Sequence, residues 1–151
     1  MSAANRSILL VEDSADDVFL MRRALQRAKV VNPLYVVEDG REATDYLSGI
    51  GKFADRDAYP IPVIVFLDIK LPYMSGQEVL AWIRRQKELE SLIVIMLTSS
   101  NEPTDLARCY SLGANSYLVK PPTPEQLESM AKAYKWYWLE YDRKDGDRID
   151  T

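Results

Sequence analysis

Four short apolar runs of this chain each end on a side chain that can take part in chemistry. The runs stop at Glu12-Asp13, at Asp68, at Thr98 and at Lys120. A short apolar run is typical of a strand that is buried on both faces of a parallel sheet. Because open α/β sheets bind ligands at the carboxyl ends of their strands, we expect these side chains to share one edge of a sheet.

The chemistry that these residue types favour is phosphoryl transfer assisted by a divalent cation. Crowded carboxylates repel one another unless a cation joins them, and Mg²⁺ prefers carboxylate oxygens together with phosphate. Glu12, Asp13 and Asp68 therefore indicate a Mg²⁺ site, completed by a main-chain carbonyl. Asp68 can act as a nucleophile that forms an aspartyl phosphate, while Lys120 and Thr98 would bind the transferred group.

Each of these residues also has a plainer interpretation. Asp13 and Thr98 can cap helices, and Lys120 can be a solvated loop lysine. Asp39 also follows an apolar run, but its strand is expected at the edge of the sheet, so we interpret it as a turn or cap residue. The joint pattern, rather than any single residue, favours the phosphoryl-transfer hypothesis.

Strands and helices are expected to alternate along the chain. Apolar runs predict strands at 8–11, 34–37, 63–68, 92–97 and 116–119, with a helical pattern after each. Capping boxes beginning at Ser75 and Thr123 start two of the helices, and Asn32-Pro33 is expected to end the first. Residues 50–62 show no clear period and form an insertion or a functional loop. The pattern predicts the fold class α/β, as a doubly wound, five-stranded parallel sheet. We expect the flavodoxin-like order 2-1-3-4-5 from the chain length and the number of strands, because the sequence itself does not display the order.

The bulk properties exclude several classes of protein. The length of 151 residues suits one domain with a full core, and a net charge of −4 argues against nucleic acid as a direct partner. No apolar run approaches the roughly 18 residues that suggest a membrane span, and the N-terminus does not read as a signal peptide. The single Cys109 suits a reducing, cytoplasmic location. With no histidine, the chain lacks Ser-His triads, His-ligated zinc and a phosphohistidine-carrier role.

The motif set resembles the receiver domain of two-component response regulators over roughly residues 6–140. The resemblance rests on residues at or just after the ends of four predicted strands. They are Glu12-Asp13 after the first strand, Asp68 with Pro72 and Gly76 at the third, Thr98 at the fourth and Lys120-Pro121 at the fifth. It implies one receiver domain over 1–151, with a core at about 6–141. Residues 142–151 are polar and charged, so we expect them to be a frayed tail. Because the chain ends about thirty residues after the fifth strand, we expect no output domain.

The resemblance also implies roles for individual residues. Asp68 would be the phosphoacceptor and Lys120 the phosphate-binding lysine, with a cis bond to Pro121. Thr98 and Tyr117 would form the switch pair. Magnesium would be bound by Asp13, Asp68 and the main-chain carbonyl of Lys70, with Glu12 in support. Glu12 stands where the family commonly has Asp, and Pro122 where it often has Phe, so the packing after the lysine is expected to differ.

Two features resemble the single-domain regulators that are paired with phytochrome-type sensor kinases. They are the Pro-containing insertion before the third strand and the aromatic final helix, Tyr134-Lys135-Trp136-Tyr137-Trp138. Trp136 and Leu139 lie off the apolar stripe of that helix, so we expect a homodimer interface there. The alternative is that they are isolated exposed apolar residues, which are common on protein surfaces.

The expected function is therefore a switch rather than an enzyme. A sensor histidine kinase, with a bacteriophytochrome as the candidate type, would donate the phosphoryl group to Asp68, and a conformational change or dimerisation would carry the signal. One alternative is a Mg²⁺-dependent phosphohydrolase with an aspartyl-phosphate intermediate, which generally has a second acid where this chain has Lys70. Another alternative is a scaffold whose acidic site is not phosphorylated.

Overall fold

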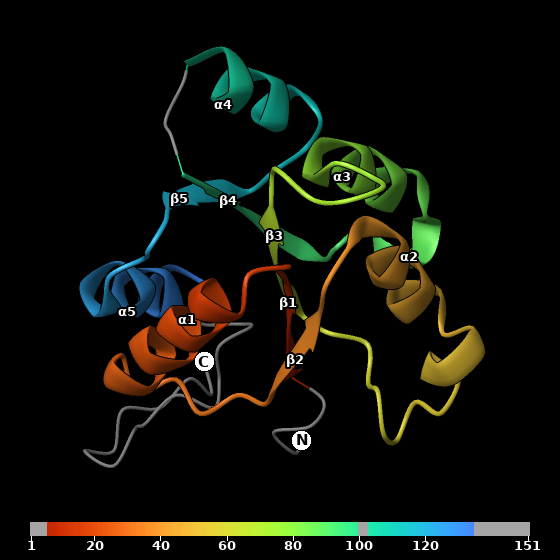
Figure 1. The fold of residues 1–151 in the computed structure, drawn as a ribbon, viewed down its shortest axis with the longest axis horizontal. Coiled ribbons are helices and arrows are strands. Elements are labelled where there is room, and N and C mark those ends of the chain that lie inside the picture. The colour runs from red at the N-terminus through yellow and green to blue at the C-terminus, as the bar shows by residue number, and fades with distance from the viewer. Residues whose placement is uncertain (1–5, 100–102, 135–151) are drawn as a thin grey trace.

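Five parallel strands form one sheet in the order β2-β1-β3-β4-β5 (Figure 1). This computed structural model describes residues 6–99 and 103–134. The strands are β1 Ile8–Val11, β2 Leu34–Val37, β3 Ile64–Asp68, β4 Ile93–Thr98 and β5 Ser116–Val119. The doubly wound sheet and its predicted strand order are confirmed.

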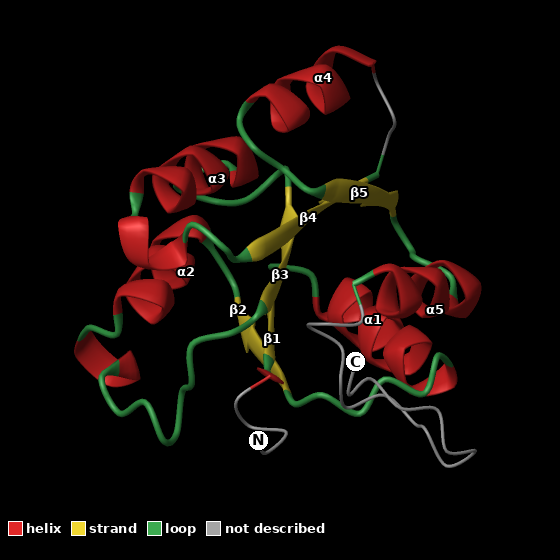
Figure 2. Cartoon of the chain, turned by 180° about the vertical axis from the view of Figure 1, so that it is seen from behind, coloured by secondary structure: helices red, strands yellow, loops and turns green. Residues whose placement is uncertain are grey.

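Helices cover both faces of this sheet (Figure 2). On one face lie α1 Ala15–Arg27 and α5 Pro124–Ala133, which contact each other. On the other face lie α2 Gly40–Ser48, α3 Gly76–Arg85 and α4 Pro103–Ser111, with α3 in contact with both of its neighbours. No helix in these described parts of the chain combines the length and apolar character needed to cross a membrane.

The core has two halves because side chains of a strand point alternately to opposite faces. Leu9 and Val11 of β1 pack into the cluster that includes residues of α2 and α3. Ile8 and Leu10 pack into the cluster that includes residues of α1 and α5. All four side chains are fully buried, which explains why the strand reads as an uninterrupted apolar run.

Local capping signals begin the helices where the sequence predicts them. Ser75 and Thr123 each form a complete capping box, in which the side chain accepts from a main-chain N–H and the third helical residue bonds back. Ser14 caps α1, and Asp39 accepts from the N–H of Glu42 at 2.8 Å and so caps α2. The interpretation of Asp39 as a cap residue is therefore confirmed.

The end of α1 differs from the prediction. The helix stops at Arg27, well before Asn32-Pro33. Lys29 adopts a left-handed conformation with φ 65°, and the N–H of Val30 then donates to the carbonyl of Leu25 at 3.0 Å. This reversal turns Val30 into the core, where it is buried, so packing ends the helix before the proline can.

The insertion at 50–62 is a packed segment held by Arg56. It contains a short 3₁₀ helix, Gly51–Phe53, that the sequence pattern did not predict; a second one is Lys87–Leu89. The guanidinium of Arg56 donates to the carbonyls of Tyr46, Leu47 and Tyr59 at 2.8–3.1 Å. These contacts fix the insertion against the end of α2, so we interpret the insertion as a structural segment.

Candidate functional site

Asp68 is the last residue of β3 and lies at the carboxyl edge of the sheet between β1 and β4. It is only 5% exposed. The next helix begins in close contact with it, because a Cβ added to Gly76 would lie 2.9 Å from the carbonyl carbon of Asp68. The N–H of Gly76 donates to the carbonyl of Ile69 at 2.8 Å. The glycine therefore allows α3 to pack directly against the end of the strand that carries Asp68.

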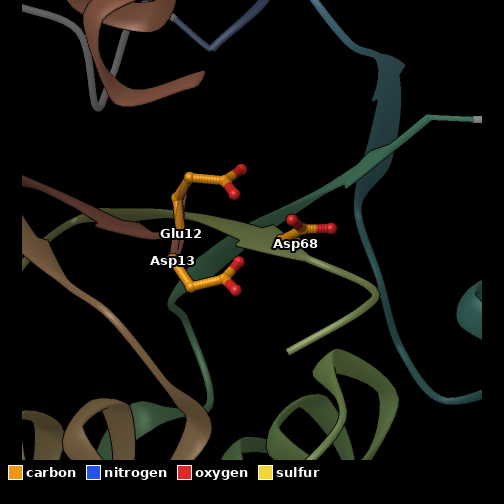
Figure 3. A group of neighbouring side chains, drawn as sticks. All are labelled: Glu12, Asp13 and Asp68. Carbon is orange, nitrogen blue, oxygen red and sulfur yellow. The ribbon is translucent and has the colours of Figure 1, made fainter. Parts of the chain in front are cut away.

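Three carboxylates meet at this edge. Oxygen atoms of Glu12, Asp13 and Asp68 lie within 4.8 Å of one another, and Figure 3 shows these side chains gathered at the ends of β1 and β3. Glu12 is 2% exposed and Asp68 is buried, while Asp13 is open to solvent. Oxygen donors in a partly open cluster fit a hard divalent cation that retains some water. The residues present therefore fit the predicted metal site.

Lys120 brings a positive charge to this cluster from the end of β5. Its ammonium donates to Asp68 Oδ2 at 2.8 Å, to Asp17 Oδ2 at 2.9 Å and to Glu12 Oε1 at 3.1 Å. The peptide bond between Lys120 and Pro121 is cis, as the family resemblance implies. The lysine side chain is 14% exposed, so these ion pairs lie in a partly dehydrated setting.

The surroundings shift the pKa values of two of these groups. Burial and then the charge of Asp68 raise the pKa of Glu12 to about 7, although Lys120 acts in the opposite direction. Burial lowers the pKa of Lys120, but its hydrogen bonds to Asp68 and Asp17 outweigh burial and raise the pKa overall. Lys120 is therefore a charged ammonium at neutral pH, and Glu12 takes up a proton near neutrality.

The two oxygens of Asp68 are held from different directions. The main-chain N–H of Lys70 donates to Oδ1 at 3.1 Å, and the ammonium of Lys120 donates to Oδ2 at 2.8 Å. A cleft of about 420 Å³ opens above them, lined by both lysines, Asp68 and the neighbouring acidic residues. Asp68 thus presents a fixed carboxylate to a small, polar opening.

Thr98 and Tyr117 lie near this site without lining the cleft. Thr98 ends β4, is 6% exposed, and accepts on its carbonyl the N–H of Lys120 at 2.7 Å. Tyr117 lies in β5, half-buried, with its ring edge-on to that of Tyr110 at a centroid distance of 6.1 Å. Their pairing as a switch stays a prediction.

The sequence pattern missed Asp17. This residue lies in the first turn of α1, where acidic residues are common because they favour the positive end of the helix dipole. What distinguishes Asp17 is its ion pair with Lys120, and this contact forms only in the folded chain, so no local sequence pattern identifies it. The predicted interface residues Trp136 and Leu139 lie outside the described residues.

Comparison with known proteins gives consistent matches along the chain. A model of the response regulator receiver domain matches residues 8–132. The probable methanogenesis regulatory protein FilR2 of Methanothrix harundinacea is 37% identical over 139 residues, which cover 92% of this chain and 87% of FilR2. The response regulator Rcp1 of Synechocystis is 34% identical over 133 residues, which cover 88% of each chain.

Solved structures of similar sequence are response regulators as well. The bacteriophytochrome response regulator RtBRR is 44% identical, with a TM-score of 0.75 over 84% of this chain and 75% of that one. The Mn²⁺-bound form of Rcp1 is 33% identical, with a TM-score of 0.71 over 91% of this chain and 96% of that one. Sequence and fold therefore point to the same group of proteins.

Proposed function

Because this chain belongs to the family of response regulator receiver domains, we propose that it accepts a phosphoryl group on Asp68 and signals through the resulting change of conformation. The observation that carries the proposal is the position of Asp68. Its carboxylate is buried at the sheet edge, bonded to Lys120, and grouped with Glu12 and Asp13. A structural aspartate would not need two further carboxylates beside it, since these raise the energy of its ionised form.

In the proposed reaction, a carboxylate oxygen of Asp68 attacks the phosphorus of a phosphohistidine. A P–O bond forms, the P–N bond breaks, and its electron pair leaves with the imidazole of the donor. Lys120 stays within hydrogen-bond reach of Asp68 and would neutralise charge on the transferred group. Lys70 holds the second oxygen of Asp68 through its main-chain N–H, which orients the nucleophile.

We propose Mg²⁺ as the cation of the carboxylate group. Glu12, Asp13 and Asp68 would hold it, together with the main-chain carbonyl of Lys70. When bound, it would offset the negative charge that gathers in the transition state. Support comes from the oxygen donors themselves and from the metal-bound structure of the similar regulator Rcp1, in which the ion is Mn²⁺.

The proposed phosphodonor is a sensor histidine kinase of the phytochrome type. The similarity to RtBRR and to Rcp1 supports this class of partner, with a cytoplasmic location that suits it. Phosphorylation would act through Thr98 and Tyr117, and the signal would leave by a homodimer interface that includes Trp136 and Leu139. The protein would then be a switch rather than an enzyme, assisting only its own phosphorylation and dephosphorylation.

Phosphotransfer profiling tests this function. The full chain is mixed with autophosphorylated bacteriophytochrome kinases and Mg²⁺, and the phosphorylated form is separated on a phosphate-affinity gel. We expect labelling of the parent and none of Asp68→Asn. Asp39→Asn is the matched control, because Asp39 also follows a strand and Asn caps a helix equally well. Labelling of the Asp68→Asn variant at the parental rate would refute the proposal.

A further inference from the structure

All three N–H donors of the Lys120 ammonium are used inside the site. They reach Asp68 at 2.8 Å, Asp17 at 2.9 Å and Glu12 at 3.1 Å. A lysine side chain is charged at neutral pH, and the three carboxylates around this ammonium favour its charged form. Lys120 cannot release a carboxylate by losing a proton, so it has to exchange one acceptor for another.

Asp17 differs from the other two acceptors in its position. It belongs to the first turn of α1, whereas Asp68 ends β3 and Glu12 follows β1. The carboxylate group that fits a metal is made by Glu12, Asp13 and Asp68. The side chain of Asp17 is 33% exposed, against 1% for Glu12 and 6% for Asp68. Asp17 is thus a partner for the ammonium beside the proposed metal ligands.

Two acceptors of Lys120 would also be ligands in the proposed metal site. Glu12 Oε1 and Asp68 Oδ2 accept hydrogen bonds from the ammonium, so the same oxygens cannot bind a divalent cation equally well. Like charges on shared ligands repel each other, and the repulsion is weakly screened at buried groups. Asp17 offers the ammonium an acceptor that a metal would leave free.

We propose that Asp17 is a positioning residue that holds Lys120 beside the site while Glu12 and Asp68 turn to a divalent cation. The inference rests on the proposed function and deepens it. Asp17 raises the affinity for the cation, because it keeps an obligatory positive charge off the metal ligands. It also keeps the ammonium next to Asp68, where a phosphoryl group would arrive.

The first test is the affinity of the unphosphorylated full chain for Mg²⁺, measured by isothermal titration calorimetry. Asp16→Asn is the matched control, because Asp16 is exposed and lies in the same turn of α1 with the same charge. We expect Asp17→Asn to weaken binding about tenfold, the lower end for residues that support metal ligands. Asp16→Asn should change it less than about twofold. Equal effects of the two variants would overturn the inference.

A double-mutant cycle separates action through Lys120 from a direct effect of charge. In a Lys120→Met background, the ammonium that Asp17 holds is gone. Adding Asp17→Asn to that background should then change the Mg²⁺ affinity less than about twofold. A loss as large as in the parent background would show that Asp17 acts on the cation directly, which would overturn the inference.

These measurements use no phosphodonor, so they can be read whichever residue accepts the phosphoryl group. Phosphorylation of Asp68→Asn would refute the proposed function alone. A parent chain that does not bind Mg²⁺ would refute the proposed metal site and the role of Asp17 together. Matching Asp16 and Asp17 variants would refute the role of Asp17 alone.

Discussion

Replacing Gly76 by alanine should push α3 away from the strand end that carries Asp68. The added Cβ would lie 2.9 Å from the carbonyl carbon of Asp68 and 2.9 Å from Cα of Ile69, and closer still to the carbonyl oxygen of Asp68. Ordinary contacts of a Cβ begin at 3.4 Å, and all three neighbours are main-chain atoms. No side-chain rotation can relieve this overlap, so the backbone has to move.

The displacement should affect both stability and phosphorylation. Overpacking of this kind, together with the expected disturbance of the hydrogen bond from the N–H of Gly76 to the carbonyl of Ile69, should lower the free energy of unfolding by about 3 kcal/mol. A misplacement of the nucleophile by about 1 Å slows the reaction by about 10²-fold. Urea denaturation followed by circular dichroism measures the first effect, and phosphorylation by acetyl phosphate with Mg²⁺ measures the second.

Ser75→Ala is the control for Gly76→Ala. It removes the cap of the same helix, which costs about 1 kcal/mol, but it places no atom against the end of β3. The control should therefore lose some stability and keep the parental rate of phosphorylation. A Gly76→Ala variant within about 0.5 kcal/mol of the parent, phosphorylated at the parental rate, would refute the reasoning.

Three further predictions concern single side chains. Burial and the charge of Asp68 raise the pKa of Glu12 from 4.5 to about 7, so the free energy of unfolding falls as pH rises across that interval. Glu12→Gln should therefore raise the melting temperature in EDTA at pH 8 but not at pH 5, and equal shifts at both values would contradict this. Arg56→Met removes the guanidinium that donates to three main-chain carbonyls and should lower the free energy of unfolding by about 2–3 kcal/mol in urea. Lys52→Met, at an exposed ion pair, should leave it nearly unchanged. Thr123→Ala should cost about 1 kcal/mol and speed hydrogen exchange at the start of α5, and unchanged exchange there would contradict the role of the cap.

Much of the site follows from local signals in the sequence. The apolar run that ends at Asp68 predicts a buried strand, and Pro72 and Gly76 mark the turn that follows. The capping box at Ser75 begins α3 at the predicted residue. Parallel strands then bring Lys120 to the same edge of the sheet. These features are predictable because each depends on a few neighbouring residues or on the order of the strands.

Other features depend on contacts between distant parts of the chain. Lys29 ends α1 in a left-handed conformation without a glycine or asparagine to signal it, because Val30 packs into the core. From the sequence alone, Arg56 would be interpreted as a solvated charge. The structure shows that it donates to three main-chain carbonyls. The sequence gives Asp17 only the ordinary role of an acidic residue in the first turn of a helix. Its contact with Lys120, 103 positions later in the chain, is seen only in the structure. Tertiary contacts determine the end of α1 and the partners of Arg56 and Asp17, and no local sequence pattern predicts these contacts.

The most direct test of the central claim is to locate the phosphoryl group itself. The chain is treated with acetyl phosphate and Mg²⁺ and then with borohydride, which reduces an acyl phosphate to homoserine, and the peptides are sequenced by mass spectrometry. We predict homoserine at position 68 and none when EDTA replaces Mg²⁺. Homoserine at Asp13 or another carboxylate, with Asp68 unmodified, would contradict the account.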